Sequence, residues 1–346
     1  MRKFILILAI ILCCTYSVSA DSFTAPPVPS IGEQYFPEEP DTFSEGLAEI
    51  LRNALADLQP DLVQVMRLCF GVIIIGIICS VLNSVTVSHS KATELVAVVS
   101  ISVLLIGPAH SLIDLSVKIV QELSDYGKLL LGVMTSVLSA QGGVTMASAI
   151  YVGTMFFISV LTSCISKILI PMVYIYICIS IAKCAVGEQI LEQIHKFLHW
   201  LMTWTLKIAL YIFTGYLSIT GVVSGSADAS AIKATKLTIN GVVPVVGNII
   251  SDASETILVS AGVMKNAIGI YGLLAIAAVW LAPFIKIGAY YLLLRSTGAL
   301  CCVFSNGQHT KLITDFSNVM RFLLAITVTV SVLLLVSTVC IMKGVS

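Results

Sequence analysis

Apolar and polar positions alternate along this chain in long blocks. Nine mostly apolar segments follow one another and are separated by short polar links. Because about 20 apolar residues form an α-helix that crosses the hydrocarbon core of a bilayer, the pattern predicts an all-α, polytopic integral membrane bundle. The candidate spans are Leu68–Val85, Leu95–Ile113, Leu129–Ala140, Met146–Ile165, Ile168–Ala182, Leu201–Val222, Ile268–Pro283, Ile287–Phe304 and Phe322–Met342.

Two places in this pattern leave the number of crossings between seven and nine. Leu129–Ala140 is too short to cross alone, and Ile268–Phe304 can be one kinked unit around Pro283 and Lys286. Nine crossings from an outside start put the C-terminus inside. They also put five link lysines on the cytoplasmic side, as the positive-inside rule favours: Lys91, Lys183, Lys196, Lys286 and Lys343. The support from charge is moderate, because Lys233, Lys236, Lys311 and Arg321 then fall outside.

Composition supports a membrane protein and excludes several other classes. Of the 346 residues, 58% are hydrophobic and 11% charged, with a mean hydropathy of +1.00, whereas about a quarter of a soluble domain is charged. The formal net charge is zero and no basic run is present, so the chain lacks the features of a nucleic-acid-binding protein. We expect one membrane domain over residues 62–346, in contact with membrane lipid.

The N-terminus has the pattern of an export signal. Arg2 and Lys3 precede the apolar run Phe4–Cys14, and small residues at Val18-Ser19-Ala20 suit signal peptidase. We therefore expect a signal peptide over residues 1–20 with cleavage after Ala20. The alternative is an uncleaved first membrane helix, for which the run is short.

Residues 21–61 are predicted to form an acidic arm outside the cytoplasm. This segment holds nine acidic residues and one basic residue, Arg52. Its first half is rich in proline and typical of an extended or mobile arm. Thr42 and Glu45 then have the spacing of a capping box, and apolar residues from Leu47 to Leu58 recur every three or four positions. This amphipathic helix either docks a partner or rests on the bundle or on lipid headgroups.

Some links are too polar to cross the membrane and too apolar to be free loops. Leu115–Leu123 and Glu188–Leu201 alternate charged and aliphatic residues at helical spacing, which predicts interfacial amphipathic helices. The small residues of Ser139–Gly143 permit close backbone approach or a re-entrant turn, although we expect an ordinary hairpin there.

The motifs of common enzyme chemistry are absent from the sequence. There is no P-loop, HExxH, GxSxG or CxxC pattern, so we expect no ATP hydrolysis, no other enzymatic activity and no cofactor. His195 and His199 are four residues apart, with Glu192 nearby, a spacing that can place two imidazoles on one metal. Two interfacial histidines beside Trp200 and Trp204 need no metal, and we expect none.

The stretch from Asn240 to Gly269 combines a helix break with charged residues at predicted membrane depth. Pro244 and Gly247 interrupt any helix that arrives from Ala231. Downstream, small and polar residues spaced three and four apart share one helix face. These residues are Asp252, Glu255, Val259, Gly262, Asn266 and Gly269. We therefore predict a broken or re-entrant helix with a polar stripe that faces protein or water.

Three interpretations of this stripe remain open on the residues alone. A transporter would use the acids to coordinate an ion or solute. A subunit of an assembly would pack the small and polar face against other subunits or use it as a gate. Alternatively, Asp252 and Glu255 cap a helix at the surface.

The run PVVGNIISDASETILVSAGVMKNAIG at Pro244–Gly269 resembles the stage III sporulation protein AE family of endospore-forming bacteria. It is preceded by Lys233-Ala-Thr-Lys236 and followed by an apolar hairpin with Pro283 and Lys286. The signal peptide, acidic arm and multiple spans match that family's layout.

The resemblance implies a mother-cell membrane protein, in the outer forespore membrane during sporulation. It would join a secretion-type ATPase, ring-forming membrane proteins and a forespore partner across the intermembrane space. This channel or feeding tube supports forespore development, and the chain would be its permease or export-gate-like core. The alternative from another class is a stand-alone secondary transporter. The family supplies no catalytic residues to carry over.

Overall fold

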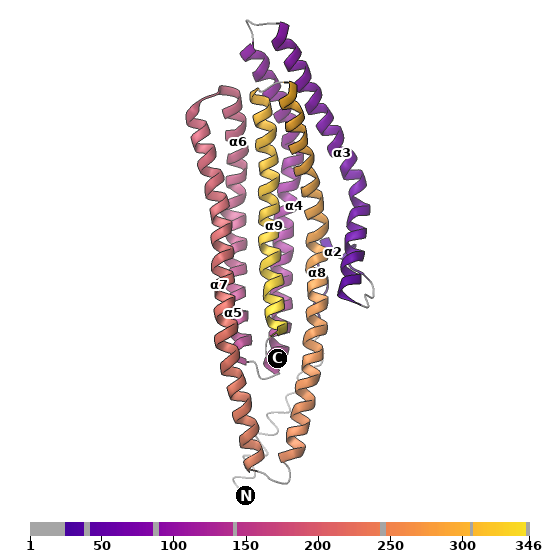
Figure 1. Cartoon of the computed structure of the whole chain (residues 1–346), viewed down its shortest axis with the longest axis vertical. Coiled ribbons are helices and arrows are strands. Elements are labelled where there is room, and N and C mark those ends of the chain that lie inside the picture. Colours follow the sequence, from indigo (N-terminus) through magenta and orange to yellow (C-terminus); the bar gives the residue numbers. More distant parts are fainter. Residues whose placement is uncertain are drawn as a thin grey trace.

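The computed structural model describes residues 25–37, 42–85, 90–140, 144–242, 247–304 and 307–343, with side chains for all of these except 84, 90, 146, 217–262 and 343. This part of the chain is almost entirely helical (Figure 1). The helices are α2 Ser30–Glu33, α3 Phe43–Val85, α4 Ser90–Ala140, α5 Val144–Cys164, the π-helical η3 Ile165–Leu169, α6 Ile170–Val186, α7 Gln189–Val242, α8 Gly247–Phe304 and α9 Gln308–Lys343.

The long helices confirm the predicted class of all-α membrane bundle. Within the described residues, five are long and apolar enough to cross a bilayer: Phe43–Asn83, Lys91–Ala140, Ala147–Val186, Val263–Phe304 and Gln308–Met342. The helix α8 has 58 residues. At 1.5 Å per residue it is about 87 Å long, far more than the roughly 30 Å of a hydrocarbon core. Such helices extend beyond the membrane that they cross.

The prediction of seven to nine separate crossings is too high, because several candidate spans belong to the same helix. The helix α4 contains both Leu95–Ile113 and Leu129–Ala140, and α8 runs unbroken through Pro283, which confirms the alternative that Ile268–Phe304 is one unit. Met146–Ile165 and Ile168–Ala182 form one rod, α5–η3–α6, in which Pro171 lies in the first turn of α6. A proline in a helix removes one hydrogen bond but need not end the helix when neighbouring helices pack around it.

The two predicted interfacial helices are also parts of longer helices. Leu115–Leu123 lies in the middle of α4, where Ile119, Val120 and Leu123 are fully buried while Lys118 is exposed. Glu188–Leu201 largely forms the first turns of α7. In Leu115–Leu123 the apolar face packs on neighbouring helices, which explains the amphipathic pattern without a separate interfacial helix. At the start of α7, in contrast, Ile190, Ile194 and Phe197 are exposed.

The helices alternate in direction, so both ends of the described bundle lie at the same end of the molecule. The start of α3 and the end of α9 both lie in the lower half of Figure 1, above the extension of α7 and α8. Nine crossings would have placed the acidic arm and Lys343 at opposite ends. This expectation is wrong because three pairs of candidate spans each merged into one rod.

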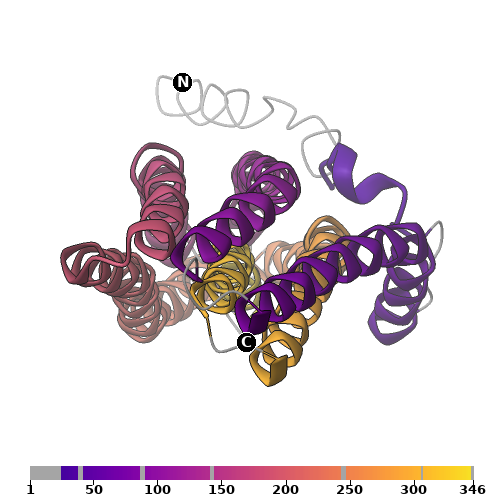
Figure 2. The ribbon, with the colours of Figure 1, turned by 90° about the horizontal axis from the view of Figure 1, so that it is seen from above.

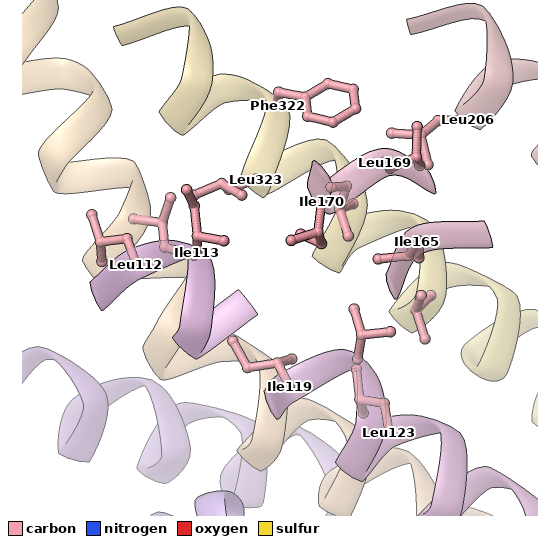
Figure 3. Close-up of a cluster of buried hydrophobic side chains, with 14 of the residues drawn as sticks. Leu112, Ile113, Ile119, Leu123, Ile165, Leu169, Ile170, Leu206, Phe322 and Leu323 are labelled. Carbon is pink, nitrogen blue, oxygen red and sulfur yellow. The ribbon is translucent and has the colours of Figure 1, made fainter. Parts of the chain in front are cut away.

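The helix α9 occupies the centre of the bundle. It packs against α4, α6, α7 and α8, and the view from above shows it surrounded (Figure 2). Aliphatic side chains of α4 and α6 converge on Phe322 and Leu323 of α9 (Figure 3). The buried hydroxyls of α9 are bonded to carbonyls of the same helix, as Ser331 donates to Thr327 O at 2.9 Å and Thr338 to Leu334 O at 2.9 Å. The helix therefore places these hydroxyls in the core with their donors paired.

The described part of the N-terminal arm is packed on the bundle. The Glu122 carboxylate of α4 accepts hydrogen bonds from Ser30 Oγ at 2.5 Å and from the Ile31 N–H at 3.0 Å. A Cβ on Gly32 would lie 2.8 Å from the Val279 side chain, so α2 lies directly on α8. The expectation of a mobile arm is therefore wrong for residues 25–37.

The predicted helix start at Thr42 is also visible. The Glu45 N–H donates to Thr42 Oγ1 at 3.3 Å, which is the first half of a capping box. The helix then continues through Pro60 into the apolar segment, so the predicted amphipathic helix and the first span are one element. Ile50 and Ala54 of this helix face the bundle, while Leu47, Leu51 and Leu55 are exposed.

Candidate functional site

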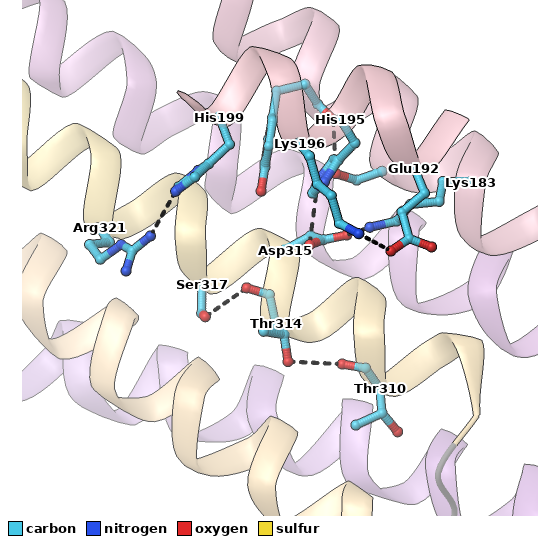
Figure 4. A network of polar contacts seen from close by, with 12 residues as sticks. Lys183, Glu192, His195, Lys196, His199, Thr310, Thr314, Asp315, Ser317 and Arg321 are labelled. Atoms are coloured by element: carbon cyan, nitrogen blue, oxygen red, sulfur yellow. Dashed lines mark hydrogen bonds and ion pairs between the residues drawn. The ribbon is translucent and has the colours of Figure 1, made fainter. Parts of the chain in front are cut away.

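Charged side chains gather where α6, α7 and α9 meet (Figure 4). Gly187 ends α6 with φ 78°, and its N–H donates to Lys183 O at 2.9 Å. A residue without a Cβ adopts this left-handed conformation at little cost, so the chain turns at once into α7. The tight hairpin brings Lys183 of α6 and His195 of α7 to the same side of α9.

The centre of this cluster is a buried ion pair. Lys183 Nζ lies 2.7 Å from Asp315 Oδ2, and the two side chains are 13% and 9% exposed. A buried carboxylate and a buried ammonium each lose hydration, so leaving either one alone would cost several kcal/mol. The pair joins α6 to α9 across 132 positions of sequence and therefore restrains the packing of these helices.

His195 completes the cluster as a neutral side chain. Its ring stacks on Tyr176 with centroids 4.2 Å apart, and its Nε2 lies 3.4 Å from Asp315 Oδ1 without forming a hydrogen bond. The residue lies in the first turns of α7, before the apolar segment that begins at Leu201. Burial, with the Lys183 ammonium nearby, lowers the pKa of His195 to about 4. The imidazole is uncharged at neutral pH.

The neighbouring charges on α7 have other partners. His199 Nε2 accepts a hydrogen bond from Arg321 Nη2 at 3.1 Å, and Lys196 pairs with Glu192 at 2.7 Å. The two histidines therefore face different groups instead of sharing a ligand. In the part of the chain that the structure describes, no group of three or more His, Cys, Asp or Glu side chains is arranged to hold a metal.

A cavity of about 330 Å³ opens beside the ion pair. Its wall includes Lys183 and Asp315 together with Glu192, Lys311 and Thr314. Three acidic and two basic side chains line it, Glu188, Glu192 and Asp315 with Lys183 and Lys311, so it has no dominant charge that would select a small ion. The arrangement suits a structural role, in which paired charges determine how α6, α7 and α9 pack.

The predicted stripe lies on α8 near the opposite end of the bundle. Gly247 is the first residue of α8, and α7 ends at Val242, so the predicted break falls between two helices, although Pro244 lies outside the described residues. The side chains of Asp252 and Glu255, and the surroundings of Gly262, are likewise outside them.

The last two residues of the stripe, Asn266 and Gly269, are described and differ in their exposure to solvent. Asn266 is exposed, whereas Gly269 is buried, and a Cβ on Gly269 would lie 2.6 Å from Met342 and 3.2 Å from Met134. Because α9 ends at Lys343, the residues of α8 that precede Gly269 extend beyond the end of α9. Figure 1 shows α7 and α8 continuing together past the other helices.

Sequence reasoning did not single out Asp315. One signal could have identified it, because Asp315 is the only acidic residue after Glu255 in the chain. Two other interhelical contacts were also missed. Lys286 pairs with Asp61 at 2.8 Å, and Glu94 Oε1 accepts the N–H of Gln308 at 2.5 Å at the start of α9. Each joins residues that are more than 200 positions apart.

The fold and the site together define a polytopic helical membrane protein in which paired charges hold the helices of the bundle. The chain belongs to the stage III sporulation protein AE family, whose sequence profile matches residues 39–346. It is similar to stage III sporulation protein AE of Bacillus subtilis (strain 168), with 21% identity over 256 residues. That match covers 74% of this chain and 64% of the relative, slightly less than two thirds of its length. No solved structure matches the chain.

Proposed function

We propose that this protein is a membrane subunit of a channel between mother cell and forespore, in which it serves as the permease or export-gate-like core. The observation that carries the proposal is family membership over residues 39–346. A stage III sporulation role follows from the family, and the channel is the function that the family resemblance implies. In this proposal the protein resides in the outer forespore membrane and has no enzymatic activity of its own.

The packing of the bundle supports a subunit more than a stand-alone transporter. A transporter needs polar groups free to bind its solute near the middle of the membrane. In α9, the hydroxyls of Thr329, Ser331 and Ser337 are instead bonded to carbonyls of their own helix. The buried carboxylate of Asp315 is paired with Lys183. These groups stabilise the bundle and are already satisfied.

The extension of α7 and α8 supports contact with other subunits. Both helices continue past the end of α9, on the side where α3 begins (Figure 1). If the acidic arm lies outside the cytoplasm, this extension projects into the space between the two membranes. The stripe of Asp252, Glu255 and Gly262 would then pack against, or gate, a partner there.

Two experiments test the proposal at different levels. Deletion of the gene in its spore-forming host should leave engulfed forespores that fail to develop, and normal development would refute the channel role. Affinity purification from sporulating cells should recover the secretion-type ATPase and ring-forming proteins. Ion-driven solute uptake by the purified protein in liposomes, without partners, would favour the transporter instead.

The stripe is tested by the double substitution Asp252→Asn with Glu255→Gln. We expect heat-resistant spores to fall by about tenfold, the size of effect when an interface loses one important contact. Protein level and membrane localisation should stay unchanged. The matched control is Glu45→Gln with Glu49→Gln, which alters two exposed acids on α3. Normal sporulation of the Asp252/Glu255 variant would show that these acids only cap the helix.

A further inference from the structure

A second cavity lies between α7 and α9, next to the ion-pair cluster but separate from it. Its volume is about 440 Å³, and its wall consists of one face of each helix. Polar and basic residues line it together with Leu206, Leu210, Phe322 and Ala325. We call this cavity the α7–α9 groove. Neither the buried ion pair nor the predicted stripe uses it.

The groove is polar at one end and apolar at the other. The helices α7 and α9 both begin at the upper end of the bundle, so they run parallel (Figure 1). The 3.1 Å hydrogen bond between Arg321 and His199 joins them at the polar end. Leu210 and Thr329 lie eleven and eight residues further along, so the groove extends about 12 to 16 Å in the direction of the helix axes.

The charge of the groove is entirely positive. Lys207 and Arg321 line it, and no Asp or Glu does. Across the described ranges, neither cation has a carboxylate within ion-pair distance, whereas Lys183 and Lys196 nearby each have one. Because Arg321 can only donate, His199 must accept through Nε2 and is itself neutral. Further N–H groups of the guanidinium remain for an anionic ligand.

Aromatic residues indicate where the groove lies relative to the bilayer. Trp200 and Trp204 follow His199 and Thr203 directly in the sequence, and are 53% and 45% exposed. Exposed tryptophans of membrane proteins concentrate at the level of the lipid headgroups. The polar end of the groove is therefore at headgroup level, and its apolar end reaches toward the hydrocarbon core.

We propose that the α7–α9 groove binds one anionic phospholipid of the surrounding bilayer. The lipid phosphate interacts with Arg321 and with Lys207, whose long side chain can extend toward the headgroup level. An acyl chain lies along Leu206, Leu210 and Phe322. Positive charge at one end and apolar walls at the other match an anionic lipid better than a zwitterionic one. The bound lipid would fill the space between the two helices.

Native mass spectrometry of the purified, full-length protein tests this proposal. The delipidated protein in detergent is titrated with phosphatidylglycerol and, separately, with phosphatidylcholine. We expect one tightly bound phosphatidylglycerol and weaker binding of phosphatidylcholine. The double variant Arg321→Gln with Lys207→Gln should bind phosphatidylglycerol about tenfold more weakly. The control variant Arg295→Gln with Lys118→Gln removes two exposed cations elsewhere and should bind like the wild type.

A second variant tests the apolar end of the groove. Ala325 is exposed and lines the groove, so Ala325→Trp should fill it without disturbing buried packing. We expect this variant to lose phosphatidylglycerol binding although all cations remain. Unchanged elution and helical circular dichroism confirm that each variant is folded.

Three results would overturn the proposal. They are equal binding of the two lipids, unchanged phosphatidylglycerol binding in either groove variant, and full competition by glycerol 3-phosphate in large excess. The last result would assign the groove to a soluble phosphate compound. None of these outcomes depends on the channel role, because the measurement uses the isolated protein.

Discussion

The ion-pair cluster and the α7–α9 groove use charge in opposite ways, although both lie on α7 and α9. In the cluster, Lys183 and Asp315 are buried and lie 2.7 Å apart. In the groove, Lys207 and Arg321 are exposed, and no carboxylate lines the wall beside them. The two regions differ because the cluster contains a buried acid and the groove does not. In the cluster the acid pairs with a base and holds the helices together, whereas the cations of the groove are available to a ligand.

The largest loss of stability is expected from a substitution that breaks the ion-pair cluster. Asp315→Ala leaves the Lys183 ammonium buried without its partner and should destabilise the protein by about 3 to 5 kcal/mol. Thermal unfolding in detergent measures this loss. The control Asp125→Ala removes an exposed acid that pairs with Lys128 at 2.7 Å, and should cost no more than about 1 kcal/mol.

A variant that removes both charges of the ion pair tests whether the loss of stability comes from leaving one buried charge unpaired. If the cost of Asp315→Ala comes from an unpaired buried charge, then Lys183→Met with Asp315→Leu should recover most of the stability. A double variant that is as unstable as Asp315→Ala would show that the carboxylate itself, and not the pairing, is required.

Lowering the pH is expected to destabilise the protein by a smaller amount. The unfolded imidazole of His195 titrates near its ordinary pKa of 6.5, but burial lowers the folded value to about 4. Between these values the unfolded chain binds the extra proton, so stability falls as the pH falls from about 6.5 toward 4. From pH 7 to pH 5, His195 should account for a loss of about 2 kcal/mol.

The variant His195→Phe keeps an aromatic ring against Tyr176 but does not titrate. Its unfolding temperature should therefore depend less on pH than that of the wild type. If the unfolding temperatures of the two proteins changed equally with pH over this range, the pH dependence of stability would not come from His195.

The smallest effect is expected in the groove. Lys207→Gln with Arg321→Gln removes exposed cations without carboxylate partners among the described residues, so stability in lipid-free detergent should change by less than about 1 kcal/mol. The same thermal unfolding measurement checks it. A loss as large as that of Asp315→Ala would mean that these cations stabilise the bundle as the cluster does, and the contrast between the two regions would disappear.

Much of the fold could be predicted from the sequence because hydropathy depends on local composition. The apolar segments and the helix start at Thr42 lie where the pattern predicts them. The number of crossings could not be predicted in the same way. Whether Leu95–Ile113 and Leu129–Ala140 form two helices or one depends on whether other helices cover the link between them.

The candidate sites show the same limit more strongly. The hydropathy pattern predicted that Asp252 and Glu255 are charges at membrane depth. In the structure Gly269 lies against Met342 at the end of α9, so these acids belong to the part of α8 that extends beyond the end of α9. The depth of a residue depends on which helices surround it. A hydropathy pattern does not contain this information.

By itself, the sequence determined the class of protein, the family, and the positions of most apolar helical segments. These properties depend on composition, on helical periodicity and on a specific run at Pro244–Gly269, all of which are local. The tertiary structure alone decided that Lys183, His195 and Asp315 meet, that residues 25–37 pack on the bundle, and that Lys207 and Arg321 share a groove. Each of these contacts joins segments distant in sequence, so it exists only once the helices have packed.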